Sequence, residues 1–173
     1  HGEHGVLLNA ELNKLYRSGT AYGLNLGGSY FYTSESIDSA NNTVVEISPW
    51  FGKTTADYSY RLGLNLSADV NGDDFKPYFF PEARLQINVV QGILVPYFGV
   101  DGGIQINNLR SMVGENRYIT PGLKAANTRQ KIRGNVGLKG SYTPKLSYDL
   151  GFSYGLYANM VFFVNDTNNI LGN

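Results

Sequence analysis

Apolar and polar residues alternate with a period of two in segment after segment of this chain. Successive side chains of an extended strand point to opposite faces, so this alternation indicates a sheet with one apolar and one polar face. The pattern is clearest in residues 56–68, where Tyr58, Tyr60, Leu62 and Leu64 alternate with polar residues or glycine. It recurs about eight times, each time over roughly ten residues, which is the length that a tilted strand needs to cross a membrane.

The remaining alternating segments predict the other strands of the same sheet. They are residues 5–15, 20–32, 43–52, 79–89, 95–107, 132–142 and 145–154. We therefore expect an all-β fold, an antiparallel up-and-down transmembrane β-barrel of about eight strands. It would be a single domain over residues 1–173, either a complete small barrel or a portion of a larger one. Prolines at positions 49, 77, 81 and 96 remove ladder donors and are expected at strand starts, bulges or the rim.

The alternation alone does not say which face points inward. A soluble sandwich or a lipocalin-like barrel would have the same pattern with the apolar face inside. Two features favour a membrane barrel: the polar face combines Gly, Asn and Ser with opposite charges, and aromatic residues gather near strand ends, where an interfacial girdle belongs. These aromatic residues are Tyr16, Tyr30, Tyr32, Tyr58, Tyr60, Phe79, Tyr142, Tyr148 and Tyr154.

Charged residues in polar positions of the strands are candidates to line or fill the interior. This group comprises Glu11, Glu46, Asp57, Arg61, Glu82, Arg84, Asp101, Arg133 and Lys139. Opposite charges such as those of Glu82 and Arg84, or Asp57 and Arg61, would neutralise one another there. Acid/base catalysis by a pair such as Asp57 and Glu82 is the less common use of such residues.

Connections between the predicted strands alternate between short and long, which is typical of outer-membrane barrels. Short ones are expected near residues 17–19, 53–55, 90–92 and 143–145, and longer ones at 34–42, 71–74 and 107–130. External loops of a rigid barrel commonly carry recognition residues. The binding candidates in the last loop are Arg110, Glu115, Asn116, Arg117 and Tyr118. The alternative is a solvated, variable loop.

Composition excludes several classes of function. The formal net charge is +0, so there is no basic field for nucleic acid, and Cys 0 removes disulfides and thiolate chemistry. No run of 18 apolar residues predicts a membrane-spanning helix. Both histidines, His1 and His4, lie at the extreme N-terminus with Glu3 between them, where a metal site is the alternative to the frayed end that we expect. No arrangement of catalytic residues is found, so we expect no enzyme and no cofactor.

The second half of the chain also carries a family resemblance. Its segments are PYFGVDGGIQINNLRSMVGENRYI and IRGNVGLKGSYTPKLSYDLGFSYGLYANMVFFVND, residues 96–119 and 132–166. They resemble the barrel region of TonB-dependent-receptor-like outer-membrane proteins of Bacteroidetes, and the likeness extends loosely back to about residue 20. The resemblance implies a larger, porin-like transport barrel in the bacterial outer membrane. The chain departs from that family in having no plug domain, no energy-coupling box and no terminal aromatic strand.

We therefore expect the chain to be part of a receptor or transport barrel for solute uptake. Its partners would be outer-membrane lipid and an unidentified solute or surface ligand, with no nucleic acid. A self-contained eight-stranded barrel with a structural or loop-mediated binding role is the first alternative, because its interior is just wide enough for side chains to fill. A soluble lipocalin-like barrel that binds an apolar ligand is the second.

Overall fold

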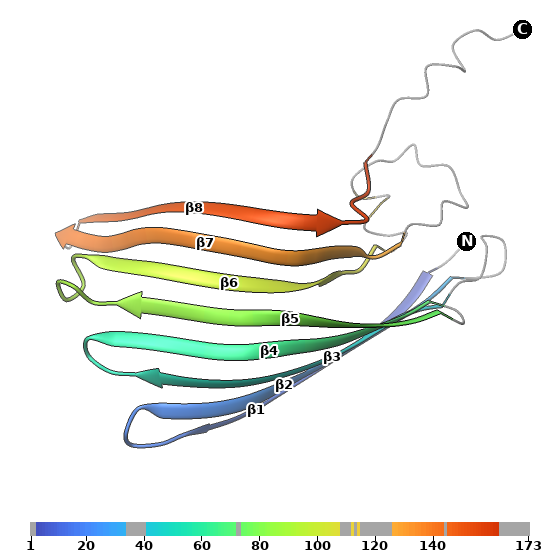
Figure 1. Ribbon diagram of the computed structural model, residues 1–173, viewed down its shortest axis with the longest axis horizontal. Coiled ribbons are helices and arrows are strands. Elements are labelled where there is room, and N and C mark those ends of the chain that lie inside the picture. Colours follow the sequence, from blue (N-terminus) through green and yellow to red (C-terminus); the bar gives the residue numbers. More distant parts are fainter. Residues whose placement is uncertain are drawn as a thin grey trace, which may run out of the picture.

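The computed structural model describes residues 3–33, 41–71, 74–107, 112, 114, 126–143 and 145–162. These residues form eight antiparallel strands that lie side by side in chain order (Figure 1). The strands are β1 (Glu3–Leu15), β2 (Thr20–Thr33), β3 (Asn42–Thr54), β4 (Tyr58–Asn71), β5 (Asp74–Ile87), β6 (Val95–Gln105), β7 (Thr128–Thr143) and β8 (Leu146–Ala158). All eight predicted strands are thus present, most of them longer than the alternation indicated.

The sheet is open, with β1 and β8 as its two edges. The predicted up-and-down antiparallel order is confirmed, whereas the predicted closure into a barrel is not found in the structure. Each edge strand has 13 residues and pairs with one neighbour, β2 or β7. Such edges present rows of backbone donors and acceptors that can pair with a further strand.

The connections follow the predicted arrangement with one exception. Residues 16–19, 55–57 and 88–94 join strands at one end of the sheet, which we call the turn end, and β7 ends and β8 begins at the same end. Residues 34–41 and 106–127 separate strands at the other end, the loop end. The prediction of a long connection at 71–74 is wrong, because Asn71 pairs directly with Asp74 and only two residues separate β4 from β5. Among the described residues, no helix has the length and apolar character needed to cross a membrane.

The four prolines lie on the apolar face of the strands. Pro49, Pro77 and Pro81 are inside β3 and β5, and Pro96 is the second residue of β6. Proline has no backbone donor, and the β3–β4 register runs from Ile47 opposite Leu66 to Trp50 opposite Gly63, with Pro49 in the interval. The expectation of a strand start therefore fits Pro96 alone.

Pairing between strands is unequal along the sheet. Strands β4 and β5 pair from Tyr58 to Asn71, over the whole of β4, but β5 and β6 pair only through Ala83–Gln86 and Tyr97–Val100. Strands β5 and β6 have the shortest run of paired residues in the sheet, so fewer backbone hydrogen bonds join them than join the other neighbours.

Burial is inverted relative to a soluble sheet protein. Many large apolar side chains are exposed, whereas the few buried residues include the polar Ser67, Asn127 and Thr128. Val44 and Phe80, which are also buried, stand in strand positions that alternate with the apolar ones. The sheet thus shelters its polar face and leaves its apolar face open.

Candidate functional site

The polar face of the sheet is the candidate functional site, because it gathers the charged side chains that the alternation assigned to one side. The register places Arg61 opposite Arg84, Gly63 opposite Glu82, and Asp101 opposite Arg133. Glu11, Glu46 and Lys139 stand in the equivalent positions of β1, β3 and β7.

One sequence candidate, Asp57, is not on this face. Asp57 lies in the connection between β3 and β4, where its backbone carbonyl accepts a hydrogen bond from the Asn88 N–H at 2.7 Å. The loop candidates Arg110, Glu115, Asn116, Arg117 and Tyr118 lie outside the described residues.

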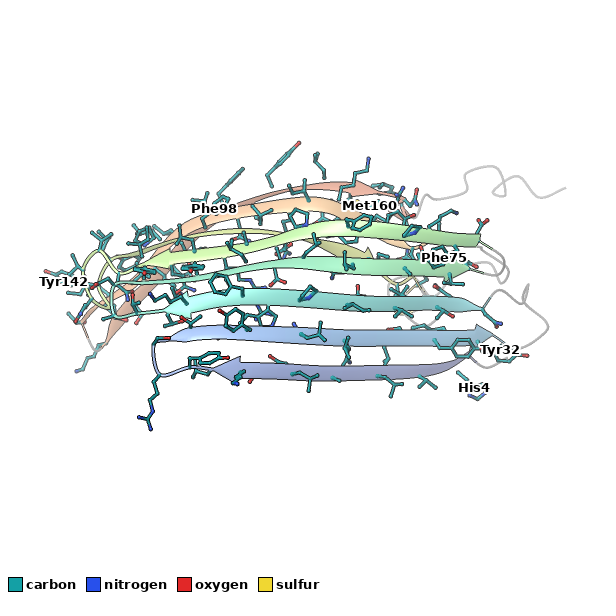
Figure 2. The ribbon with its side chains drawn as sticks, turned by 60° about the horizontal axis from the view of Figure 1, so that its bottom comes forward. His4, Tyr32, Phe75, Phe98, Tyr142 and Met160 are labelled. Carbon is teal, nitrogen blue, oxygen red and sulfur yellow. The ribbon has the colours of Figure 1, made fainter. Side chains whose placement is uncertain are left out.

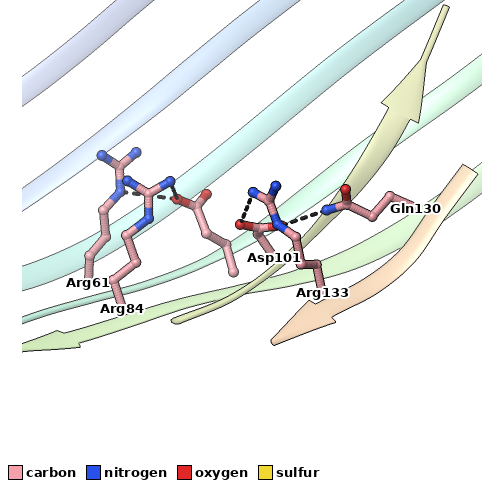
Figure 3. A network of polar contacts seen from close by, with 6 residues as sticks. Arg61, Arg84, Asp101, Gln130 and Arg133 are labelled. Carbon is pink, nitrogen blue, oxygen red and sulfur yellow. Dashed lines mark hydrogen bonds and ion pairs between the residues drawn. The ribbon is translucent and has the colours of Figure 1, made fainter. Parts of the chain in front are cut away.

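The first cluster on the polar face consists of two arginines that share one carboxylate (Figure 3). Glu82 Oε1 is 3.8 Å from Arg61 Nε and 3.7 Å from Arg84 Nη2. The Arg61 guanidinium also stacks over the Trp50 ring at 4.0 Å from its centroid, an arrangement that fixes its orientation. Among the described residues, no aromatic ring stacks on Arg84, and its side chain is 63% exposed.

A second cluster centres on Asp101, which accepts hydrogen bonds from two residues of β7 (Figure 3). Arg133 donates from Nε at 3.0 Å and from Nη2 at 2.8 Å, and Gln130 Nε2 donates at 2.6 Å. Charge-assisted bidentate pairs of this kind are among the stronger polar contacts in proteins. The cluster is therefore internally neutralised.

Gln130 reaches Asp101 because β7 carries one extra residue. Gln130 and Arg133 stand three positions apart, so strict alternation would put them on opposite faces. The register steps from Gln130 opposite Tyr157 to Ile132 opposite Leu156, which leaves Lys131 as a bulge. The bulge returns Gln130 to the polar face. Sequence reasoning missed Gln130, because residues 128–131 are all polar and so show no apolar alternation whose phase could reveal the bulge.

Two large aromatic rings cover glycines of neighbouring strands on the polar face. Trp50 lies against Gly23 and Tyr97 lies against Gly137, and a Cβ atom at either glycine would overlap the ring. The Tyr97 hydroxyl also donates to Asp149 Oδ1 at 2.9 Å, across β7. These rings therefore need glycine beside them, which explains glycines in strand interiors.

A third polar cluster lies at the loop end and shows how the sheet curves. Asn127, which precedes β7, is 2% exposed. Its Nδ2 donates to Asn42 Oδ1 at 2.9 Å and to Asp69 Oδ1 at 2.8 Å, and its Oδ1 accepts from the Asn107 N–H at 3.1 Å. Asn42 is on β3, and in a flat sheet four strand spacings of ~4.8 Å would hold β3 and β7 about 19 Å apart. The sheet and the residues before β7 must therefore curl over the polar face, which is concave at this end.

Two hollows lie on the polar face. One, of ≈350 Å³, is bordered by Asn65, Glu82, Arg84, Asp101, Gln130 and Arg133 among others. The other, of ≈280 Å³, includes Trp50, Ser59, Arg61, Arg84 and Gln86 in its lining. Arg84 borders both hollows.

The apolar face carries a row of aromatic rings at the turn end. The rings of Tyr16 and Tyr22, Tyr22 and Phe51, Phe51 and Tyr60, and Tyr58 and Tyr60 have centroids 5.9, 5.3, 5.7 and 6.2 Å apart. We call these five residues the turn-end aromatic row. It crosses from the β1–β2 turn to β4, in contacts typical of favourable aromatic pairs.

Aromatic residues also stand near the loop end. Figure 2 shows Tyr32 and Phe75 at that end and Tyr142 at the turn end. On β2, Tyr22 and Tyr30 are eight residues apart, which corresponds to about 26 Å along a strand. Leu24 and Leu26 lie between them. Phe79 and Tyr154 differ from the expected girdle positions, because both lie in the middle of their strands.

Comparison with protein-family models, with curated proteins and with solved structures gives no match for this chain. The resemblance of residues 96–119 and 132–166 to TonB-dependent-receptor-like proteins accordingly stays an expectation. The function of the chain must therefore be inferred from its architecture and from the chemistry of its two faces.

Proposed function

We propose that this chain forms the wall of an outer-membrane β-barrel that belongs to a receptor or transport barrel for solute uptake. In this proposal the apolar face contacts lipid, and the concave polar face borders a water-filled interior. The family resemblance of the second half of the chain agrees with such a role.

The observation that carries the proposal is the exposure of the apolar face. Large apolar side chains on β1, β5 and β8 are mostly exposed: Leu8, Leu12, Phe79, Leu150 and Phe152 have between 61% and 71% of their surface accessible. Water would penalise a continuous apolar surface of this extent, whereas lipid would not.

The distribution of aromatic residues on the apolar face supports the proposed contact with lipid. Aliphatic residues separate the turn-end aromatic row from Tyr30 and Tyr32 at the loop end. An outer-membrane barrel has an apolar band about 25 Å tall between two aromatic girdles. At the tilt of about 40° that such strands have, this separation of about 26 Å along the strand spans about 20 Å of membrane thickness, most of that height.

The polar face supports a role in handling solutes. Its charges include Glu82 between two arginines, and two hollows of ≈350 and ≈280 Å³ lie along it. Interiors of barrels that carry water or solute are polar in this way.

The edge strands favour a second candidate, a self-contained eight-stranded barrel with a structural or loop-mediated binding role. With an even number of up-and-down strands, β1 and β8 run antiparallel to each other, and both have 13 residues. A seam between them would keep Leu8 and Leu12 on the same side as Leu150 and Phe152. The interior would then be filled by side chains.

Refolding with and without lipid tests the membrane assignment. The full chain is diluted from denaturant into buffer, into detergent micelles or onto liposomes. We expect β-type circular dichroism, flotation with liposomes and heat-modifiable gel mobility only where an apolar phase is present. Monomeric β-structure in plain buffer that does not float with liposomes would contradict the proposal and favour a soluble ligand-binding barrel.

Efflux from loaded liposomes then separates the two membrane candidates. A transport barrel should release a small entrapped sugar, whereas an eight-stranded barrel filled with side chains should retain it. Retention by correctly inserted protein would therefore favour the self-contained barrel.

A further inference from the structure

We propose that Arg84 and Arg61 form an anion-binding position on the polar face that takes the carboxylate or phosphate group of a small solute. This inference deepens the proposed function and rests on it, because the solute must reach the concave face. The position is supported by charge balance, by unused hydrogen-bond donors and by access.

The charge balance around Glu82 leaves one positive charge in excess. Arg61 and Arg84 are direct cross-strand partners in the β4–β5 register. Like charges directly opposite each other destabilise a sheet. The single carboxylate of Glu82 faces both guanidinium groups, so one positive charge has no counterpart in this cluster. A bound anion would relieve that repulsion.

The donors of the two arginines are also poorly used. The distances of 3.8 and 3.7 Å to Glu82 are longer than a hydrogen bond. Arg61 Nε is buried and finds no hydrogen-bond partner among the described residues. Arg133 is the contrast, because its Nε and Nη2 both donate to Asp101 at 3.0 and 2.8 Å.

The two arginines combine a fixed donor with an accessible one. The Arg61 guanidinium stacks on Trp50, 4.0 Å from the ring centroid. The Arg84 side chain is 63% exposed and borders both hollows. A planar guanidinium fork matches the oxygens of a carboxylate or phosphate. An anion entering either hollow would therefore meet Arg84, and in the ≈280 Å³ hollow it would meet Arg61 as well.

The same geometry disfavours a metal cation. Glu82 lies between the two arginines, and Asp101 already accepts from Arg133 and Gln130. A cation would have to displace these positive or donating groups. The excess charge selects against it.

Titration of the refolded full chain in detergent micelles tests the proposal. Inorganic phosphate and acetate are added at constant ionic strength, and binding is measured by calorimetry and by the fluorescence of Trp50, which is the only tryptophan. We expect saturable binding that Arg84→Gln weakens by about tenfold or more, since it removes a charge-assisted interaction. Arg84→Lys should fall between, because it keeps the charge without the fork.

Arg17→Gln is the matched control, because Arg17 lies in the β1–β2 turn and carries the same charge. Equal weakening by Arg17→Gln and Arg84→Gln would overturn the proposal in favour of unspecific attraction. Absence of phosphate and acetate binding by protein with native gel mobility, or saturable binding of Ca²⁺ in their place, would overturn it too. Failure to insert into micelles would instead count against the proposed function.

Discussion

The two faces of this sheet hold their side chains in different ways. On the polar face, Asp101 and Asn127 each accept or donate several hydrogen bonds within the chain. On the apolar face, side chains such as Leu150 and Phe152 project from the sheet with most of their surface accessible. The polar face therefore derives its order from within the chain, whereas the apolar face depends on whatever surrounds it.

Two adjacent residues that face opposite sides of one strand show this difference between the faces most directly. Leu64 and Asn65 are neighbours in β4, opposite Pro81 and Phe80. We expect Leu64→Lys to destabilise the protein in lipid bilayers by about 2–4 kcal/mol, the cost of a lysine near the midplane of a lipid-facing strand. Unfolding by urea in vesicles, followed by Trp50 fluorescence, measures this change.

Asn65→Lys is the matched control, because it adds the same charge to the polar face. Asn65 borders the ≈350 Å³ hollow on the polar face, so the added ammonium group can reach solvent without entering the lipid. We expect its cost to stay within ~1 kcal/mol. Equal costs for the two variants would mean that the apolar face does not contact lipid.

Much of this fold could be predicted from the period-two alternation. The alternation located all eight strands and put Arg61, Glu82, Asp101 and Arg133 on one face, because side-chain direction in a strand depends only on position. The bulge at Lys131 could not be predicted, since an extra residue interrupts the pattern without a sequence signature.

The alternation also does not predict how strongly the sheet curves or whether it closes. The hydrogen bonds between Asn127 and residues on β3 and β4 join segments 85 and 58 positions apart, and no local pattern encodes such contacts. The two-residue connection between β4 and β5 was missed for another reason. The stretch 71–74 has the composition of a loop, but Asn71 and Asp74 already belong to the paired strands.

The Asn127 cluster allows the contribution of the polar face to be measured. Asn127→Ala removes the bonds to Asn42 and Asp69 and leaves those side chains with unsatisfied polar atoms in a sheltered place. We expect a loss of about 1–3 kcal/mol in the free energy of unfolding. Because the loss arises within the chain, it should be similar in micelles and in vesicles.

Asn13→Ala is the control for this substitution. Asn13 is exposed on β1 and makes one long bond of 3.4 Å to Glu11. Its removal should change stability by less than ~0.5 kcal/mol. If Asn127→Ala were equally mild, the curl of the sheet over its polar face would not depend on this cluster.

The turn-end aromatic row offers the smallest and most selective effect. Tyr22 stands between Tyr16 and Phe51, with ring centroids 5.9 and 5.3 Å away. Tyr22→Leu keeps the apolar character but removes both aromatic contacts, so we expect a loss of about 0.5–1.5 kcal/mol. Tyr22→Phe keeps the rings and removes only the hydroxyl, which an interfacial tyrosine would direct to the headgroups. In vesicles the Phe variant should therefore lose a part of the stability that the Leu variant loses, as measured by urea unfolding. Equal stability of the wild type and both variants would show that the turn-end aromatic row does not act as a membrane girdle. The apolar face would then not depend on its surroundings at this end of the sheet.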